Sequence, residues 1–326
     1  MTWKRRGVLA VAGALIGLAA PRASAQGAWP NRPLRFIISA QVGGVSDIFL
    51  RILENRLRER LGQPLYIDPR PGGGGMLAAE AAIRAGDQHS FTINHIASHA
   101  ISPAVFRNRG TFEPLRDLPG VARFATLPNV LILASNLPIR TPQELAAQIR
   151  ANPRQANFSS AGAGTSSHLS GLLFAQRMGV EVTHVPYRGT APALQAVLGG
   201  DVLFNIDNTP VSRPHVLSGA LRAIGVSTAQ RASTMPEIPT LQELGVPDFD
   251  VSSWYGIAAP ASTPRQIVDR LSAALLEAVA DPEIAARFRD VGAEPWPLGT
   301  EAYNDFIRAE QGRWAEVARV AGATVE

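Results

Sequence analysis

The sequence contains no cysteine, and its single lysine is Lys4. The absence of cysteine excludes disulfide frameworks, thiolate-bound zinc, iron–sulfur clusters and cysteine nucleophiles. Because the one lysine lies at the very start of the chain, the rest can supply neither a Schiff-base lysine nor the lysine of a nucleotide-binding P-loop. Covalent and nucleotide-dependent chemistry of these kinds is therefore excluded from the body of the protein.

Long apolar runs and an excess of charge are also missing. No stretch reaches the ~18 consecutive apolar residues typical of a membrane-spanning helix, so an integral membrane protein is not expected. The formal net charge is +4, and the first 25 residues hold four basic side chains and no acidic one, so the remaining chain is balanced. A nucleic-acid binder should carry a basic surplus, and we expect no nucleic-acid partner.

What is present is the composition of a folded protein. The chain has 326 residues, of which 46% are hydrophobic and 18% are charged. This is too apolar and too weakly charged for a disordered chain. The length allows one large domain and favours about two.

The first 25 residues have the pattern of an export signal. Residues 4–6 are basic, residues 7–20 form an apolar run, and Ala23, Ser24 and Ala25 form a small-x-small cleavage site. We predict cleavage near Ala25 and a periplasmic mature protein. A retained anchor helix is the alternative. Arg5 and Arg6 permit twin-arginine export, and general secretion fits equally well.

Short β-rich segments alternate with helical patterns over the rest of the chain, which predicts an α/β protein with mainly parallel strands. No flexible linker separates the two halves, so we expect two domains joined by crossing strands, with a cleft between them. Thr141 to Glu144 and Thr263 to Gln266 have the pattern of helix capping boxes. Strands are expected at 34–38, 65–67, 91–93, 130–133, 182–185, 202–206, 223–226 and 254–259, and helices from Asp47, at 76–85, from Thr141, at 169–178, at 191–198, and from Thr263, Asp281 and Thr300.

Two glycine-containing loops precede helices in the first half. The loop from Gly43 to Asp47 offers backbone amides at a helix start, where an anion can bind, although a tight turn with Asp47 as N-cap explains it equally well. The run from Gly72 to Gly75 lacks the Gly-Lys-Ser/Thr of a P-loop. Close backbone approach to a neighbouring loop or a small ligand is the better interpretation of that run.

Residues 162–168 combine two glycines, three hydroxyl side chains and a helix N-terminus after a strand. Ligands bind at the carboxyl ends of strands in open α/β sheets, and a helix N-terminus suits a carboxylate. A serine-rich N-cap with His168 as a capping residue is the alternative. Asp207 and Asn208 also follow a buried strand. The Asp207 carboxylate can accept a hydrogen bond from a ligand, or the pair can form an Asx turn.

Catalytic and metal sites have weak support. Ser166 or Ser167 with His184 and Asp207 would make a hydrolase triad, but the loop lacks the G-x-S-x-G elbow. His95 and His99 are four residues apart, as on one face of a helix, but no glutamate motif accompanies them. We predict that the protein is not an enzyme and that it binds neither a cofactor nor a metal.

Several segments, in this order and spacing, resemble the extracytoplasmic solute-binding receptors of tripartite tricarboxylate transporters, the Bug proteins. The resemblance covers essentially the whole mature chain. It rests on residues 29–35, 43–47, 61–64, 70–74, 160–169, 185–189, 207–208, 254–256 and 259–264.

The resemblance implies a two-domain periplasmic-binding-protein (Venus flytrap) fold, type II-like, with the ligand cleft between the domains. We assign residues 26–128 and 255–326 to domain I, residues 129–254 to domain II, and the hinge to residues 123–129 and 253–257. It further implies a monomeric receptor for a small carboxylate, such as a di- or tricarboxylate, an acidic amino acid or an aromatic acid. The partner would be the membrane permease subunits of the transporter.

The family holds carboxylates on the two loops around Gly43 and Gly164, largely through backbone groups and waters, and its residue matching Asp207 often faces the cleft. Arg188 is the best candidate for a cation. The predicted ligand-binding residues are Ser39, Gln41, Gly43, Gly44, Ser46, Asp47, His99, Gly164, Thr165, Ser166, Ser167, Arg188 and Asp207.

The chain departs from the family pattern in its first loop. Ser39 and Ala40 replace a usual Pro-Phe, and Val42 replaces a proline, which opens space on the first-domain side. His95 and His99 replace small residues, and we expect both to line the cleft.

Two further points concern single side chains outside the first loop. Leu172 stands where the family favours a glutamate, which puts one polar contact in doubt. Trp254 or Tyr255 would suit an aromatic or longer-chain acid. A ligand sensor for a signalling partner and an extracytoplasmic hydrolase remain as alternatives.

Overall fold

The computed structural model describes residues 29–106, 112–320 and 322–323. The predicted export signal and its cleavage site lie outside these residues. Within the described part of the chain, no helix is long and apolar enough to cross a membrane.

The strands of the described residues form one hydrogen-bonded path in the order β2-β1-β3-β9-β4-β7-β5-β6, with β8 and β10 added along β4. Neighbours on each outer side are parallel, whereas β9 and β4 pair antiparallel in the centre. The strands are β1 (Leu34–Ile38), β2 (Leu65–Pro69), β3 (Ser90–His95), β4 (Gly120–Ala134), β5 (Asn157–Ser160), β6 (Thr183–Pro186), β7 (Phe204–Asn208), β8 (Leu221–Val226), β9 (Ser252–Ala258) and β10 (Glu294–Leu298).

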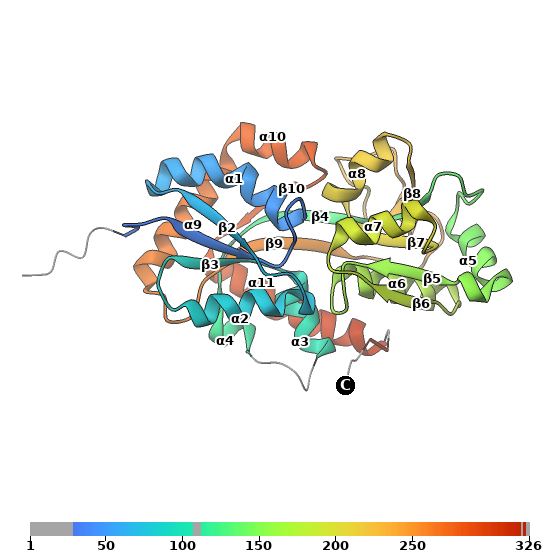
Figure 1. Ribbon diagram of the computed structural model, residues 1–326, viewed down its shortest axis with the longest axis horizontal. Helices are drawn as coiled ribbons and strands as arrows, with labels where there is room; N and C mark the ends of the chain where they lie inside the picture. Colours follow the sequence, from blue (N-terminus) through green and yellow to red (C-terminus); the bar gives the residue numbers. More distant parts are fainter. Residues whose placement is uncertain (1–28, 107–111, 321, 324–326) are drawn as a thin grey trace, which may run out of the picture.

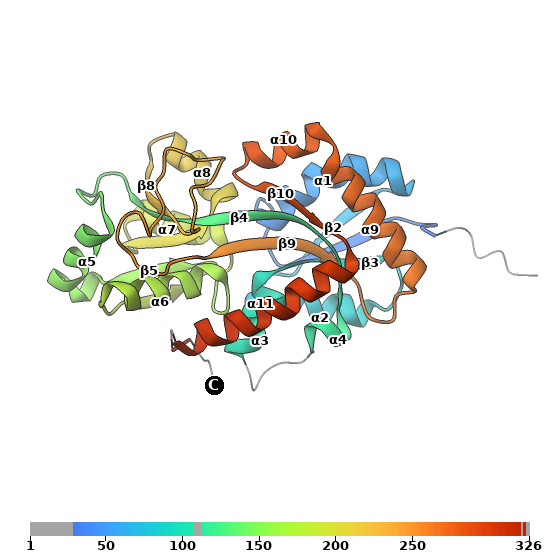
Figure 2. The same cartoon turned by 180° about the vertical axis from the view of Figure 1, so that it is seen from behind.

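The described residues form two lobes, and the strands β4 and β9 run from one lobe into the other (Figure 1; Figure 2). This α/β arrangement confirms the predicted periplasmic-binding-protein fold, while the exact domain boundaries stay a prediction. Helices α1 (Val45–Leu61), α2 (Met76–Ala85), α3 (Ser102–Val105), α4 (Pro114–Asp117), α9 (Arg265–Ala280), α10 (Pro282–Asp290) and α11 (Thr300–Val320) belong to the first lobe, and α5 (Pro142–Ala151), α6 (Ser166–Met178), α7 (Thr190–Gly199) and α8 (Thr209–Leu217) to the second.

Strand β4 is the structural link between the lobes. Its first half pairs with β9 and β10, and its second half pairs with β7 and β8. The sequence predicted only residues 130–133 as strand, and the structure extends this strand back through Pro128 and Asn129 to Gly120. The buried Asn129 is satisfied through tertiary contacts: its backbone N–H donates to Ser227 Oγ at 2.8 Å, and its amide donates to Ser170 Oγ at 3.2 Å.

Apolar clusters hold each lobe together. In the first lobe, one side of α1 buries Phe49, Leu53 and Leu57 against β1 and α9, with the three-to-four-residue spacing of an amphipathic helix. In the second lobe, Phe158 and Phe204 stack with ring centroids 5.6 Å apart. Burying each such side chain contributes about 1.5–3 kcal/mol.

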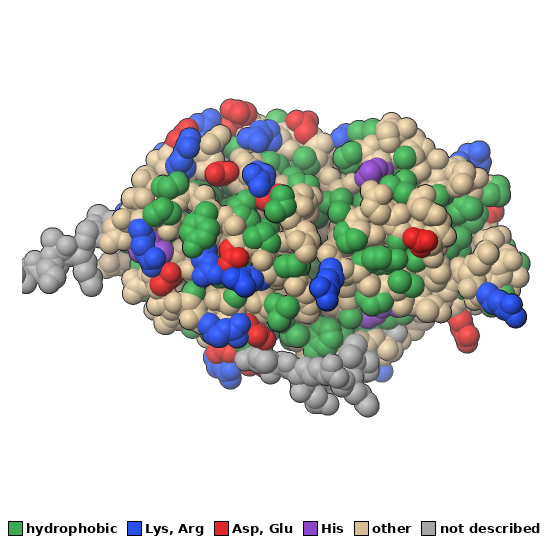
Figure 3. Space-filling view, in the orientation of Figure 1, with side chains coloured by type: hydrophobic (Ala, Val, Ile, Leu, Met, Phe, Trp, Pro, Cys, Tyr) green, Lys and Arg blue, Asp and Glu red, His purple; other side chains and the backbone are tan. Residues whose placement is uncertain are grey.

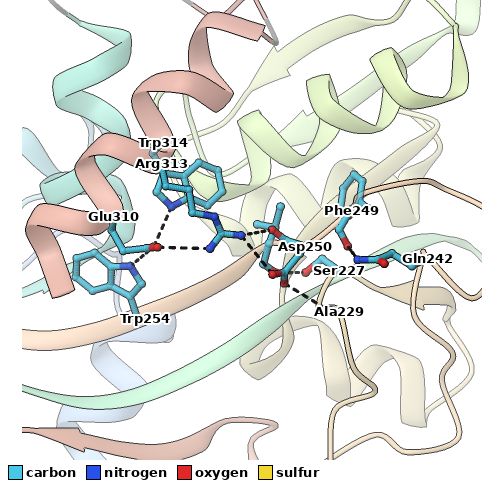
Figure 4. A network of polar contacts seen from close by, with 10 residues as sticks. Ser227, Ala229, Gln242, Phe249, Asp250, Trp254, Glu310, Arg313 and Trp314 are labelled. Carbon is cyan, nitrogen blue, oxygen red and sulfur yellow. Dashed lines mark hydrogen bonds and ion pairs between the residues drawn. The ribbon is translucent and has the colours of Figure 1, made fainter.

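Helix α11 ties the first lobe to the crossing strands (Figure 4). The buried carboxylate oxygen Oε2 of Glu310 accepts hydrogen bonds from the indole N–H groups of Trp254 and Trp314, both at 2.9 Å. One turn along, Arg313 donates to the backbone oxygen of Asp250 at 2.6 Å. These contacts fix β9, and the segment that enters it, against α11.

The sequence predicted how three helices are capped at their starts, and the structure confirms only one of these predictions. The capping box at Thr141 is confirmed. The second expected box is wrong, because Pro264 occupies the N-cap of α9 and the helix has no side-chain cap. Helix α1 begins at Val45 with Gly44 as N-cap, which puts Asp47 inside the first turn instead of at the cap.

Candidate functional site

A cavity of about 580 Å³ lies between the two lobes. Its volume is in the range of small-molecule sites. The face of the molecule in Figure 3 is hollowed at the junction of the lobes, where uncharged side chains and backbone predominate. The lining comes from first-lobe residues 39–41, 44–46, 71–75, 77 and 95–97, from second-lobe residues 161–162, 165–167, 186–192 and 207–208, and from Tyr255 on β9.

Three helix N-termini meet at this cavity. The N-caps are Gly44 for α1, Thr165 for α6 and Gly189 for α7, and the first residues of each helix line the cavity. The first amides of a helix have no intrahelical acceptor and carry its partial positive charge. The cavity therefore presents partly positive N–H groups, which are suited to anionic oxygen atoms.

The α6 loop, residues 161–167, leads into helix α6. Its hydroxyl groups mainly shape the loop itself. Thr165 Oγ1 donates to the backbone oxygen of Gly162 at 2.6 Å, and Ser167 Oγ accepts from the backbone N–H of Ala161 at 2.9 Å. Ser166 Oγ accepts a hydrogen bond from Ser253 Oγ at 3.1 Å. The Thr165 and Ser167 hydroxyls are engaged within the loop, so the donors left for a ligand are the backbone amides at the start of α6 and the hydroxyl hydrogen of Ser166.

The Gly72 to Gly75 run brings the lobes together at one end of the cavity. A Cβ atom on Gly74 would come within 2.1 Å of Ser102 Oγ and 3.2 Å of the Gly164 backbone oxygen. Ser102 Oγ lies within hydrogen-bonding distance of both carbonyls, 3.2 Å from that of Gly74 and 3.3 Å from that of Gly164. The close backbone approach predicted for this run is confirmed.

Asp207 is a buried acid at the cavity, with 1% of its surface exposed. Its Oδ1 accepts from the backbone N–H of Asn208 at 2.7 Å, and Oδ2 has no hydrogen-bond partner among the described residues. Burial raises the pKa of the Asp207 carboxyl to about 7, because a charge there would be poorly solvated. Near neutral pH a large fraction of this group is uncharged and repels an anion little.

Arg188 supplies the positive side chain at the cavity. It is exposed, and it is the only lysine or arginine among the described residues that line the space. No ion pair engages it within the described part of the chain. It is free to attract or contact an anion that enters between the lobes.

Most of the predicted ligand-binding residues lie together at this cavity, drawn from segments far apart in the chain. The loops before α1 and α6 face each other across it, as expected. The predicted residues that line it are Ser39, Gln41, Gly44, Ser46, Thr165, Ser166, Ser167, Arg188 and Asp207.

Gly43, Asp47 and Gly164 are placed outside the lining. The Asp47 carboxylate turns back into its own loop, where it accepts from the backbone N–H of Gly43 at 2.8 Å and from Arg51 at 3.0 Å. Gly164 packs against Phe106, where a Cβ atom would come within 2.7 Å of the ring. In this structure the three residues build the loops and do not face the space between the lobes.

The expectation that His99 lines the cleft is wrong. It is fully buried in the first lobe, and its Nε2 lies 3.0 Å from the backbone oxygen of Leu118. Burial lowers the pKa of His99 to about 4. His95 does line the cavity, but it ends β3 while His99 lies in the π-helical turn Ala97–Ile101, so the two share no helical face.

The aromatic candidates divide in the same way. Tyr255 lines the cavity, whereas Trp254 points to the opposite side of β9 and contacts Glu310.

The sequence-based prediction missed the N-terminus of α7 as a binding element. Its signal was present in Gly189 and Thr190 before Pro192, since a proline in the first turn is typical of a helix start.

The hydrolase triad is not formed. His184 Nε2 lies 2.6 Å from Ser160 Oγ, not from Ser166 or Ser167, and its ring stacks on His168 at 4.1 Å. Burial lowers the pKa of His184 to about 3, so the ring is a poor proton acceptor at neutral pH. These groups support the α6 loop.

Residues 49–322 match the model of the tripartite tricarboxylate transporter family receptor. The chain belongs to this family. BugT of Bordetella pertussis is 31% identical over 323 residues, which cover 98% of each chain. The expected resemblance to Bug proteins is thereby confirmed, and the chain is a solute-binding protein of periplasmic type, not an enzyme.

Two solved receptors of Rhodopseudomonas palustris share the fold and contain ligands. Rpa4515 with adipate is 34% identical with a TM-score of 0.86, and the match covers 90% of this chain and 98% of that one. MatC with bound malate is 30% identical with a TM-score of 0.82, and the match covers 89% and 99%. Adipate and malate are both small dicarboxylates.

Proposed function

We propose that this protein is an extracytoplasmic receptor that captures a small carboxylate between its lobes and delivers it to the membrane permease of a tripartite transporter. The observation that carries the proposal is the meeting of three helix N-termini at one cavity. Its family membership and the dicarboxylates bound by Rpa4515 and MatC support the same ligand class. We further propose export by residues 1–25, cleavage near Ala25, and a monomeric mature protein.

In the proposed binding step, one carboxylate docks on the free amides of α6 and α7 in the second lobe. Arg188, at the edge of that lobe, attracts the anion before it is bound. Asp207, which is uncharged in a large fraction of the molecules near neutral pH, repels the anion little. The absence of lysine from the cavity is consistent with recognition by backbone dipoles.

Closure is proposed to follow by bending where the crossing strands pair. Thr126 lies opposite Trp254, and Leu127 lies opposite Ser253, at the point where β4 and β9 pass from one lobe to the other. A ligand that contacts both lobes stabilises the closed form by its differential affinity. The closed molecule then presents a surface composed of both lobes to the permease.

The first test is a thermal-shift screen of residues 26–326 against succinate, malate, adipate, citrate, glutamate, benzoate and nicotinate. A ligand at 100 times its dissociation constant stabilises the fold by about 2.7 kcal/mol. We expect the largest shift from a dicarboxylate. No shift with any of these acids, from ligand-free and folded protein, would refute the proposed ligand class.

The second test removes one amide from the α6 N-terminus. Ser166 is the first helical residue, and the extended backbone of Thr165 before it, with φ −96° and ψ 165°, is compatible with a following proline. Ser166→Pro should weaken binding of the best acid by about 10- to 100-fold, the worth of one hydrogen bond to a charged group.

Two controls accompany this variant. Ser166→Ala removes the hydroxyl alone and measures its separate contribution to affinity, and the loss in Ser166→Pro should exceed it. Arg265→Pro deletes the corresponding amide of α9, far from the cavity, and should leave affinity unchanged. Equal affinity of Ser166→Pro and wild type would show that the α6 amides do not hold the anion.

A further inference from the structure

Ser39 and His95 form a polar pair on the first-lobe side of the cavity. Ser39 lies in the loop after β1, and His95 ends β3, and both line the space between the lobes. Ser39 Oγ and His95 Nε2 are 2.6 Å apart. Ser39 Oγ makes no other hydrogen bond within the described part of the chain.

The direction of this hydrogen bond follows from the other ring nitrogen. The backbone N–H of Ala97 donates to His95 Nδ1 at 3.2 Å, so Nδ1 must present its lone pair. A neutral imidazole carries its one hydrogen on the opposite nitrogen, which makes His95 Nε2 the donor and Ser39 Oγ the acceptor. The hydroxyl hydrogen of Ser39 is then free to point at a ligand.

The His95 ring is held in this orientation on two sides. The Tyr255 ring lies against it, with ring centroids 5.5 Å apart. Gly75 permits the approach of the backbone, since a Cβ atom there would come within 3.1 Å of His95 Nε2. Burial lowers the pKa of His95 to about 3, so the ring stays neutral at physiological pH and the donor direction is fixed.

We propose that Ser39, oriented by His95, is a specificity-determining hydrogen-bond donor that recognises the second carboxylate of a dicarboxylate ligand. The proposal rests on the proposed function, in which α6 and α7 hold the first carboxylate in the second lobe. Ser39 faces the cavity from the opposite lobe, beside the N-terminus of α1 and its free amides. The ligand thereby contacts both lobes and holds them closed.

His95 is a positioning residue in this arrangement. It does not need to touch the ligand, because its contribution is to occupy the lone pair of Ser39 Oγ and so to direct the hydroxyl hydrogen. Without the ring, the hydroxyl can rotate and bond to neighbouring backbone groups or water. A ligand with a single carboxylate has no group for Ser39 to recognise.

The test compares adipate with hexanoate, which has the same carbon chain and lacks the second carboxylate. Dissociation constants are measured by calorimetry for wild type and Ser39→Ala. We expect Ser39→Ala to weaken adipate binding by about 10- to 100-fold and hexanoate binding by less than about 3-fold. Ser218→Ala removes an exposed hydroxyl at the end of α8 and serves as the matched control.

Variants of His95 separate orientation from packing. His95→Leu should resemble Ser39→Ala, and the double variant should be no weaker than either single variant, because both remove one interaction. His95→Gln keeps an N–H donor that can reach Ser39 and should restore most of the adipate affinity. A structural role of the ring alone would not give this rescue.

Three outcomes would overturn the inference. If Ser39→Ala weakens the binding of both acids equally, or of neither, Ser39 does not recognise the second carboxylate, and the proposed function still stands. If ¹⁵N NMR of the ligand-free protein places the His95 hydrogen on Nδ1, the orientation is wrong. If wild type binds neither acid and no other acid of the thermal-shift screen, this inference and the proposed ligand class fail together.

Discussion

Replacing Asp207 with asparagine should remove a pH dependence of stability that the fold imposes on this acid. The carboxyl is 1% exposed, and Oδ2 lacks a hydrogen-bond partner among the described residues. Asparagine has nearly the same shape, and its oxygen can keep the hydrogen bond from the Asn208 backbone N–H. The substitution therefore changes the ability to ionise and little else.

The magnitude follows from the difference between the two pKa values. The carboxyl titrates near 3.8 when unperturbed and near 7 in the fold. A difference of about three pKa units, at 1.36 kcal/mol each, corresponds to about 4 kcal/mol. Below pH ~4 the group is protonated in both states and costs nothing. As the pH rises to about 7 the unfolded state gains the favourable ionisation, so the wild-type protein loses stability relative to Asp207→Asn.

The assay is urea unfolding of both proteins between pH 4 and pH 8, followed by tryptophan fluorescence and circular dichroism. The informative quantity is the difference between the two proteins in the free energy of unfolding. Burial lowers the pKa values of His95, His99, His168 and His184, which destabilises the fold on acidification in both proteins alike. Between pH 4 and pH 8 we expect the unfolding free energy of Asp207→Asn to rise by about 4 kcal/mol relative to that of the wild type. A difference that stays constant within 1 kcal/mol would refute the reasoning.

Two further predictions concern the contacts that join the lobes. Glu310→Ala should destabilise the protein by about 2–5 kcal/mol in the same unfolding assay, because two buried indole N–H groups lose their acceptor. Glu316→Ala, which breaks an exposed ion pair on the same helix, should cost less than about 1 kcal/mol, and equal costs would contradict this account. Gly74→Ala places a Cβ atom against Ser102 and the α6 loop, so solution scattering should show a more open molecule. Unchanged scattering with unchanged adipate affinity would show that this contact does not set the distance between the lobes.

The sequence was informative wherever a local pattern has one physical interpretation. The capping box at Thr141 and the Ala-rich helix at 76–85 were predicted correctly, because their signals are complete within a few residues. The loops at Gly44 and Thr165 were recognised as helix starts for the same reason. The order of strands and helices, together with the Bug-like segments, was sufficient for the fold class.

Side-chain destinations were harder to predict, because they depend on partners far along the chain. His95 and His99 are equivalent in sequence, yet a π-helical turn between them leaves one at the cavity and buries the other. Strand β4 extends through Pro128 and Asn129 because Ser170 and Ser227, from other elements, satisfy the asparagine.

The sequence by itself determined the class of molecule: two α/β lobes, a glycine-rich loop before a helix on each side, and a body without lysine or cysteine chemistry. Only the tertiary structure decided which groups meet in the cleft. It added the N-terminus of α7, turned Asp47 into its own loop, and buried Asp207 so that its pKa rises to about 7. Helix starts are encoded locally, whereas burial and the direction of a hydrogen bond are properties of neighbours that the folded chain brings together.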